Sequence, residues 1–215
     1  MTAQTQSDRF SAERGNMVQT QLAARGIRDE RVLSAMARVP RHEFVGERYR
    51  EQAYADHPIP IAEGQTVSQP YIVALMLEVL NLHSNAKVLE VGTGSGYMTA
   101  LLAELASHVY SIERHARLAT EAAATLVRLG YNNVTILTGD GSQGLPEFAP
   151  FDGIVVSAAA SQIPAALIQQ LSEGGRMVIP VGPPDAQELQ LVVSHEGRTI
   201  VHRLDGCRFV PLIAS

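Results

Sequence analysis

The chain of 215 residues contains one cysteine, Cys207, and no tryptophan. A single cysteine cannot form an internal disulfide, so a hydrophobic core has to hold the fold and a cytoplasmic location is expected. Hydrophobic residues make up 46% of the chain, which is enough for such a core. There is no apolar run of about 18 residues, and residues 1–17 lack the apolar stretch of a signal peptide. No membrane association is therefore expected.

Positive charge and aromatic rings are also scarce. Lys87 is the only lysine, the formal net charge is −5, and aromatic residues make up 5% of the chain. RNA-binding surfaces are typically basic and lined with aromatic rings, so no nucleic-acid partner is expected. The seven histidines show no spacing typical of metal ligands, and no metal site is predicted.

The clearest pattern is a glycine-rich stretch after a short apolar segment, Val88-Leu-Glu-Val-Gly-Thr-Gly-Ser-Gly-Tyr97. The apolar residues predict a strand over 87–91, and apolar residues at helical spacing after Tyr97 predict a helix. In doubly wound α/β sheets, a strand, a glycine turn and a helix present backbone N–H groups to a ligand. Glycine suits such a turn because a Cβ would obstruct a close approach and disfavour positive φ.

Strands and helices alternate around this turn. Before it, we expect a loosely attached segment 1–15, helices over 17–24 and 30–37, a long loop over 57–70 and a buried helix over 71–80. After it, we expect strands over 109–112, 133–137, 151–156 and 176–181, helices over 115–129 and 164–171, and final strands over 188–194 and 199–210. This order predicts a doubly wound, Rossmann-like α/β sheet that is mostly parallel with antiparallel C-terminal strands. Residues 1–57 are assigned to a small helical appendage packed on the core, and residues 58–215 to the ligand-binding domain.

Acidic residues stand at or near the carboxyl ends of three successive strands. Glu113 can accept hydrogen bonds from a ribose hydroxyl pair, although a surface carboxylate would look the same in the sequence. Asp140 can accept from the exocyclic amine of adenine beside Gly141, although an Asp-Gly turn is also common. Glu90 lies inside an apolar strand and needs a partner there, either a ligand ammonium, an N–H of the glycine turn or a structural hydrogen bond.

The glycine turn departs from the dinucleotide-binding pattern. Tyr97 occupies the position where the GxGxxG or GxGxxA fingerprint places a small residue, which argues against NAD and FAD. A ligand with an amine, a ribose and an adenine but no phosphate would suit the three acidic residues. S-adenosyl-L-methionine has these parts.

The sequence resembles the protein-L-isoaspartate O-methyltransferases of the bacterial type from about Met17 to Leu212. The glycine stretch by itself indicates only the broad class I methyltransferase group, whereas Gly64-Gln-Thr-Val-Ser-Gln-Pro-Tyr71 is far more specific because it lies outside the cofactor-binding part of the fold. The other matching stretches are Gly139–Gly141, Phe151–Ile154, Ala158–Ala160, Gly174–Arg176, Pro180–Gly182 and Arg208–Leu212.

The resemblance implies transfer of a methyl group from S-adenosyl-L-methionine to the free α-carboxylate of L-isoaspartyl residues in damaged proteins and peptides, which starts their repair to aspartate. It implies a catalytic role for Ser68. The cofactor contacts that it implies are Val67, Ser68, Tyr71, Glu90, Gly92, Thr93, Gly94, Glu113, Asp140 and Gly141. A monomer is expected, and no role is predicted for the residues after Leu212.

The chemistry of the acceptor fits a modest role for Ser68. A carboxylate is already ionised near pH 7, so it needs orientation and desolvation and no general base. A serine hydroxyl can donate one hydrogen bond to a carboxylate oxygen, so Ser68 is predicted to orient the acceptor and not to attack it. From spacing alone, Ser68 could equally be the N-cap of the following helix.

Two other functions are compatible with parts of the pattern. A diverged class I methyltransferase would keep the glycine turn and the acidic residues but act on another small molecule, because fold alone does not determine function. A cofactor-binding protein without catalysis would not need Ser68. The loop 65–71 favours the repair enzyme over the diverged methyltransferase. The presence of Ser68 together with Glu90, Glu113 and Asp140 disfavours the protein without catalysis.

Overall fold

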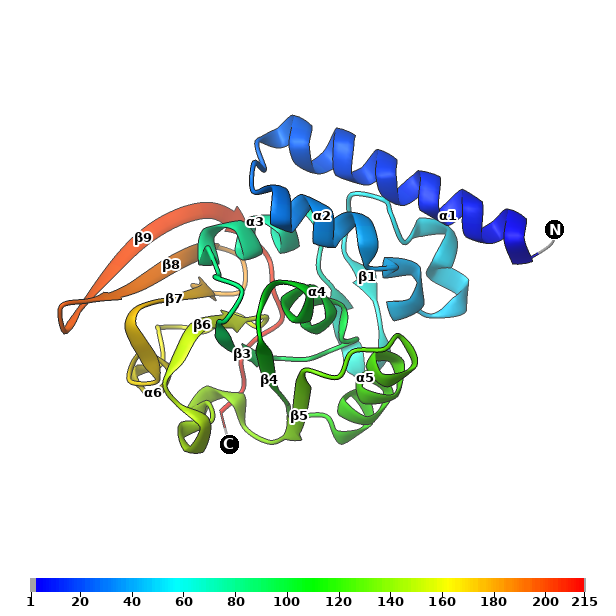
Figure 1. Cartoon of the computed structure of the whole chain (residues 1–215). Helices are drawn as coiled ribbons and strands as arrows, with labels where there is room; N and C mark the ends of the chain where they lie inside the picture. Colours follow the sequence, from blue (N-terminus) through cyan, green and yellow to red (C-terminus); the bar gives the residue numbers. More distant parts are fainter. Residues whose placement is uncertain (1–2, 215) are drawn as a thin grey trace.

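The structure, a computed structural model, describes residues 3–214, and side chains from residue 8 onward. Seven strands form one sheet in the order β5-β4-β3-β6-β7-β8-β9 (Figure 1). They are β3 (Lys87–Val91), β4 (His108–Glu113), β5 (Val134–Thr138), β6 (Phe151–Val156), β7 (Leu171–Val181), β8 (Gln187–His195) and β9 (Arg198–Cys207). Strands β3 to β7 run parallel, and β8 and β9 are antiparallel. The predicted sheet is therefore confirmed.

Helices and short turns connect and cover these strands. The α-helices are α1 (Ala3–Met17), α2 (Glu30–Arg38), α3 (Pro70–Leu80), α4 (Tyr97–Leu105), α5 (Ala116–Arg128) and α6 (Ala165–Ile168). The shorter helical turns are η1 (Val18–Leu22), η2 (Ala23–Arg25), η3 (Arg41–Phe44), η4 (Glu47–Gln52), η5 (Ala62–Gly64), η6 (Gly141–Gln143) and η7 (Pro146–Phe148). Pro70 occupies the first turn of α3, where its missing N–H has no helical partner to lose.

Two expectations for the N-terminal third were wrong. The expected loose segment 1–15 is helical from residue 3, because α1 is anchored by Phe10, which is buried and stacked on His42 with ring centroids 4.1 Å apart. The predicted irregular loop 57–70 contains two short strands, β1 (Ile59–Pro60) and β2 (Thr66–Val67), which pair antiparallel. Pairing of this kind involves residues on either side of η5 and leaves no periodic pattern in so short a segment.

A third difference lies near the end of the parallel sheet. The expected turn at Gly174 and Gly175 lies inside β7, which begins at Leu171 and not at Arg176. The register between β6 and β7 shifts between Phe151 and Gly153, so the extra residues form an irregularity in one long strand.

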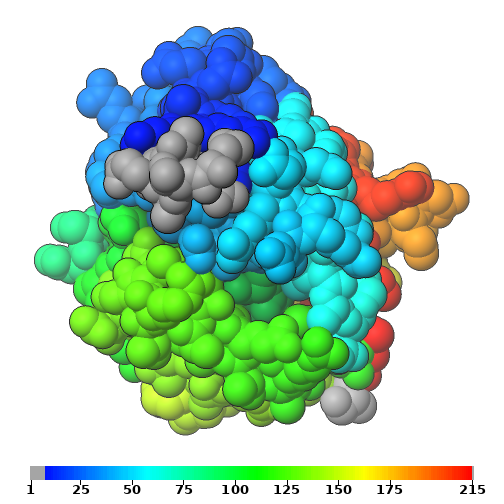
Figure 2. Space-filling model, turned by 90° about the vertical axis from the view of Figure 1, so that its right-hand side faces the viewer, coloured from blue at the N-terminus to red at the C-terminus, as the bar shows by residue number. Residues whose placement is uncertain are grey.

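Both faces of the sheet are covered. Val88 and Val109 face one hydrophobic cluster that includes residues of α1, α2, α3 and α4, whereas Leu89 and Ile112 face a second cluster with residues of η7 and α6. This alternation is the two-residue period of a strand. The helical segment before residue 58 has its buried residues in the first cluster together with α3 and α4, so it shares their core. This segment lies directly against the rest of the chain (Figure 1 and Figure 2).

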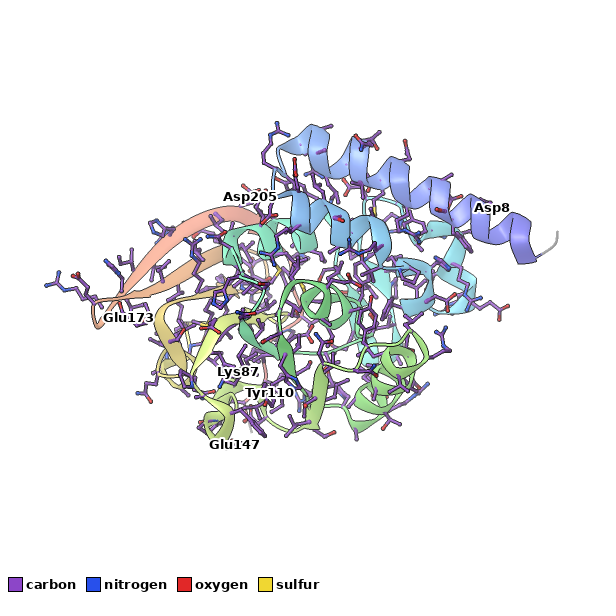
Figure 3. All side chains as sticks on the ribbon, viewed as in Figure 1. Asp8, Lys87, Tyr110, Glu147, Glu173 and Asp205 are labelled. Atoms are coloured by element: carbon purple, nitrogen blue, oxygen red, sulfur yellow. The ribbon has the colours of Figure 1, made fainter. Side chains whose placement is uncertain are left out.

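The connections place the glycine turn at the edge where a ligand is expected. The chain leaves β3 toward β4 and β5, then returns to β6 on the other side of β3, so the strand order reverses at β3. In open α/β sheets, ligands bind outside the carboxyl ends of the strands at such a switch point. Lys87 marks the amino end of β3, and Glu173 lies near the far tip of the β8–β9 hairpin (Figure 3).

Among the described residues, no helix is long and apolar enough to cross a membrane.

Candidate active site

A cavity opens at the carboxyl ends of β3 and β4. It is lined by residues 65–68, 91–95, 112–115, 157–158 and 209–213, together with Val73, Tyr97, Met98 and Gly141. Seven of the residues predicted as cofactor contacts are in this lining, namely Val67, Ser68, Gly92, Thr93, Gly94, Glu113 and Gly141. Tyr71, Glu90 and Asp140 are not.

The glycine turn packs closely against α5. Gly96 is the N-cap of α4 with φ of +87°, a conformation that side chains disfavour. A Cβ on Gly96 would lie 3.3 Å from the Cβ of Ala122 and 3.4 Å from a methyl of Leu126, both on α5. Gly96 therefore lets the start of α4 pack closely against α5, and the Tyr97 side chain that follows it is buried.

Glu113 lies at the end of β4 and is held in one orientation. It is 5% exposed. Its Oε2 accepts a hydrogen bond from the N–H of Gly94 at 2.9 Å, and its Oε1 accepts from the N–H of His115 at 3.0 Å. A carboxylate has about four lone-pair positions, so each oxygen can accept one more hydrogen bond from a ligand in the cavity.

Glu90 lies behind the glycine turn and makes structural hydrogen bonds. Its Oε2 accepts from the hydroxyls of Thr99 and Ser111, both at 2.6 Å, and Ser111 in turn contacts the Thr93 hydroxyl at 2.5 Å. The other oxygen, Oε1, is buried and has no partner among the described residues. Of the three kinds of partner considered for Glu90, the structure shows structural hydrogen bonds, which come from side-chain hydroxyls. Through Ser111 they connect Glu90 to Thr93 in the cavity wall.

Burial raises the pKa of Glu90 to about 8 from its ordinary value of 4.5, although the Ser111 and Thr99 hydroxyls lower it and Glu113 adds a smaller raising effect. The folded protein therefore keeps a proton between pH 4.5 and 8 that the unfolded chain releases. The bound proton on Glu90 raises the free energy of unfolding. This stabilisation is fully present below pH 4.5, falls as pH rises toward 8, and does not change further above pH 8.

Replacing Glu90 with glutamine should remove this pH dependence. We expect the free energy of unfolding of the wild type, relative to Glu90→Gln, to fall by up to about 1.4 kcal/mol per pH unit between pH 4.5 and 8. Urea unfolding of both proteins across that range measures the difference, and groups common to both cancel. A difference that stays constant with pH would show that Glu90 titrates normally.

Asp140 and Gly141 form the corner after β5. Asp140 is the N-cap of η6, and its Oδ1 accepts from the N–H of Ser142 at 2.9 Å. Gly141 is buried and lines the cavity, where a Cβ would lie 2.4 Å from a methyl of Val91 and 3.3 Å from one of Ile112. Glycine is required here because Val91 and Ile112 leave no space for a side chain.

The loop 65–68 forms the opposite wall. Val67 is buried and paired with Ile59, which fixes the loop against β1. The N-cap of α3 is Gln69, and no side chain caps that helix, so the capping role considered for Ser68 is wrong. The Ser68 hydroxyl has no hydrogen-bond partner among the side chains and backbone groups that the structure describes, which leaves it available to a ligand.

Tyr71 lies outside the cavity. The Cζ atom of Arg25 is 3.6 Å from the centroid of its ring, and Arg25 also forms an ion pair with Asp56 at 2.8 Å. This cation–π contact covers a face of the ring from the N-terminal segment. Tyr71 belongs to the first turn of α3, directly after the loop that carries Ser68.

The C-terminal tail forms a wall of the cavity that the sequence did not reveal. Residues 209–213 line it, and the N–H groups of Ala159 and Leu212 donate to the carbonyls of Val210 and Ala159, each at 2.7 Å. Gln187 on β8 binds both backbone polar groups of Phe209. Its Oε1 accepts from the Phe209 N–H at 2.6 Å, and its Nε2 donates to the Phe209 carbonyl at 3.1 Å. Arg208–Leu212 was a matching stretch, but no local signal indicated Gln187.

Replacing Gln187 with glutamate should loosen this wall. A carboxylate can still accept from the Phe209 N–H but cannot donate to its carbonyl, so one hydrogen bond becomes a repulsion worth about 1–3 kcal/mol. We expect the affinity for the cofactor that the sequence resemblance implies to fall about tenfold, measured by calorimetry with its demethylated form, S-adenosyl-L-homocysteine. Gln190→Glu, on the same strand and outside the cavity, is the matched control. Equal affinities in the two variants would contradict a role for the tail.

The residues present fit a nucleoside cofactor with an amino-acid part. Gly141 lines the cavity without a side chain, Glu113 presents two fixed acceptors, and Gly92, Thr93 and Gly94 line the cavity just before α4. Among the side chains described, those of residues 8–214, no group of three or more His, Cys, Asp or Glu could hold a metal ion.

The fold and the cavity together define an α/β methyltransferase domain that takes such a cofactor. Residues 12–215 match the family model of the protein-L-isoaspartate(D-aspartate) O-methyltransferases. The chain belongs to this family. It is 58% identical to a protein-L-isoaspartate O-methyltransferase of Koribacter versatilis over 206 residues, with 96% of this chain and 93% of that protein covered. It is 52% identical to one of Methanoculleus marisnigri, with 98% and 96% covered.

Solved structures of the same family superpose on the chain. One protein-L-isoaspartate O-methyltransferase gives a TM-score of 0.85 at 29% identity, with 94% of this chain and 66% of that chain covered. A Plasmodium falciparum protein, described as a protein-L-isoaspartate O-methyltransferase in complex with S-adenosyl-L-homocysteine, gives 0.81 at 29% identity, with 93% and 98% covered.

Proposed function

We propose that this chain transfers the methyl group of S-adenosyl-L-methionine to the free α-carboxylate of L-isoaspartyl residues in damaged proteins and peptides. The observation that carries the proposal is the position of Ser68, which lies in the wall between two hollows. One is the cavity at the glycine turn, and the other is an open groove beside it. Thr66, Ser68 and Phe209 line both.

The open groove suits a polypeptide acceptor. Its walls come from the loop before α3, from the turn between β7 and β8, and from the end of β9, and its lining is partly polar with Gln69, Asp185 and Arg208. A peptide lying in this groove can direct one side group past Ser68 while the rest of the chain stays at the surface. A small-molecule acceptor, which is the alternative function, would not need this groove in addition to the cavity.

The roles of the residues follow from this arrangement. When bound, S-adenosyl-L-methionine supplies a methyl group that is attached to a positively charged sulfur and is ready for transfer. The acceptor carboxylate is already ionised near pH 7, so the protein has to orient it and remove water from it. Ser68 donates a hydrogen bond to one carboxylate oxygen. The tail and the loop 65–68 exclude water from the cavity.

We assign direct cofactor contacts to the predicted residues that line the cavity, and indirect roles to those that do not. Glu113 accepts from the ribose hydroxyls, Gly141 lies against the adenine, and Gly92, Thr93 and Gly94 face the amino-acid part. Val67 and Ser68 close the cavity over it. Glu90, Asp140 and Tyr71 act indirectly, Glu90 by holding Ser111 and Thr93, Asp140 by shaping the Gly141 corner, and Tyr71 by supporting the start of α3.

Methyl transfer to matched peptides tests the proposal. Labelled S-adenosyl-L-methionine and the purified protein are incubated with two peptides that differ only in L-isoaspartate or L-aspartate at one position. We expect label in the isoaspartyl peptide alone, as a base-labile ester. Label in neither peptide would favour the diverged methyltransferase with another small-molecule acceptor, and equal label in both would remove the specificity that we propose.

We also propose that the protein acts as a monomer in the cytoplasm and has no nucleic-acid partner. Cys207 is a free thiol, and burial raises its pKa to about 11, so it is poorly reactive. The net charge of −5 disfavours binding to a polyanion. Light scattering of the purified protein with and without RNA checks the oligomeric state and the absence of RNA binding.

A further inference from the structure

Arg41 is buried in an unusual setting. Its side chain is 0% exposed, and none of the described carboxylates lies within ion-pair distance of it. One of its nitrogens, Nη1, is buried without a hydrogen-bond partner among the described residues. An unpaired buried charge costs several kcal/mol, so stability alone is poorly served by an arginine at this position.

The remaining contacts of Arg41 lead directly to the proposed catalytic loop. Its Nη2 donates to the main-chain carbonyl of Ser68 at 2.8 Å, and its Nε donates to the carbonyl of Ala53 at 2.8 Å. Its Cζ lies 4.7 Å from the centroid of the Tyr97 ring. Ser68 and Tyr97 are both in the cavity wall, whereas Arg41 and Ala53 belong to the N-terminal segment.

The shape of a guanidinium is suited to holding two carbonyl groups in a fixed arrangement. The group is planar and carries its donors in a fixed fork, so two carbonyls that bind it are held at a set distance and angle. The two carbonyls come from positions 53 and 68, on either side of the β1–β2 pair. Arg41 therefore fixes the backbone of the residue whose hydroxyl faces the ligand.

We propose that Arg41 is a positioning residue for methyl transfer, which makes the N-terminal segment part of the catalytic machinery. It holds the Ser68 carbonyl from behind, so that the hydroxyl points between cofactor and acceptor. The proposal rests on the proposed function, since Ser68 has to orient the acceptor for its position to matter. A displacement of the Ser68 backbone by about 1 Å is enough to lower the rate by roughly 100-fold.

Replacing Arg41 with methionine keeps most of the side-chain volume and removes both hydrogen bonds. We expect kcat on the isoaspartyl peptide to fall about 10- to 100-fold, with the dissociation constant of S-adenosyl-L-homocysteine changed less than about threefold. Arg41→Lys keeps the charge but loses the planar fork of donors, so its kcat should lie between that of the wild type and that of Arg41→Met. The lysine variant also serves if the methionine variant does not fold.

Arg31 offers a matched control within the same segment. It also joins this segment to the core through two carbonyls, those of Leu82 and Leu105, but it is more exposed and lies away from the cavity. Arg31→Met should lower stability while kcat stays close to that of the wild type. If Arg41→Met and Arg41→Lys keep wild-type kcat, whatever their stability, the proposal is overturned.

Hydrogen exchange separates this proposal from the proposed function. In Arg41→Met, amides of the peptide fragment covering residues 61–69 should exchange at least about tenfold faster than in the wild type, and in Arg31→Met they should not. An inactive wild-type protein would reject the proposed function without touching this measurement. Unchanged exchange in both Arg41 variants would reject the role of Arg41.

Discussion

Replacing Ser68 with alanine is expected to lower kcat on an isoaspartyl peptide about 10- to 100-fold. The estimate is the loss of one hydrogen bond to a charged acceptor, about 1.5–3 kcal/mol, converted to a rate. The Ser68 hydroxyl has no other described partner, and no side chain caps α3, so its removal leaves no buried group unpaired in the protein. The affinity for S-adenosyl-L-homocysteine should stay within about threefold of the wild type.

Steady-state kinetics with both peptides and calorimetry with S-adenosyl-L-homocysteine measure these two quantities. Ser172→Ala is a suitable control, because the Ser172 hydroxyl contacts Asp152 at 3.1 Å and does not line the cavity. A Ser68→Ala enzyme with wild-type kcat would falsify the role assigned to Ser68. A large loss of cofactor affinity with unchanged kcat would place Ser68 with the cofactor and not with the acceptor.

Replacing Glu113 with glutamine should weaken the binding of S-adenosyl-L-homocysteine by roughly 100-fold. Both carboxylate oxygens accept backbone N–H groups, those of Gly94 and His115, so the amide of glutamine has to turn its NH2 toward one of these donors. The variant therefore loses one internal hydrogen bond and one acceptor for the ribose. Each hydrogen bond to a charged group is worth about 1.5–3 kcal/mol.

Glu121→Gln removes the same charge at the surface and serves as the control. Glu121 pairs with Arg117 on α5, and both side chains are more than half exposed, so this pair contributes little to stability. Calorimetry should show the wild-type affinity in Glu121→Gln. If Glu113→Gln binds as tightly as this control, the ribose contact lies elsewhere in the cavity.

Much of the sheet could be predicted because its signals are local. The apolar strand before Gly92 and the continuous apolar run at 151–156 mark buried parallel strands, and the structure has both with the expected bounds. The partner of Glu90 could only be narrowed to three possibilities. The hydroxyls of Thr99 and Ser111 that bind it come from a helix and a neighbouring strand, and neither has a local pattern that marks it.

The sequence by itself determined the glycine turn, the acidic residues at the strand ends and the loop that carries Ser68, because turn chemistry and strand periodicity depend on neighbours in the chain. Only the tertiary structure decided how Arg41 and Gln187 act. Arg41 reaches Ser68 across 27 positions, and Gln187 reaches Phe209 across 22. Such contacts form when packing brings distant backbone groups together, and a single polar residue in the sequence does not identify which carbonyl it will bind.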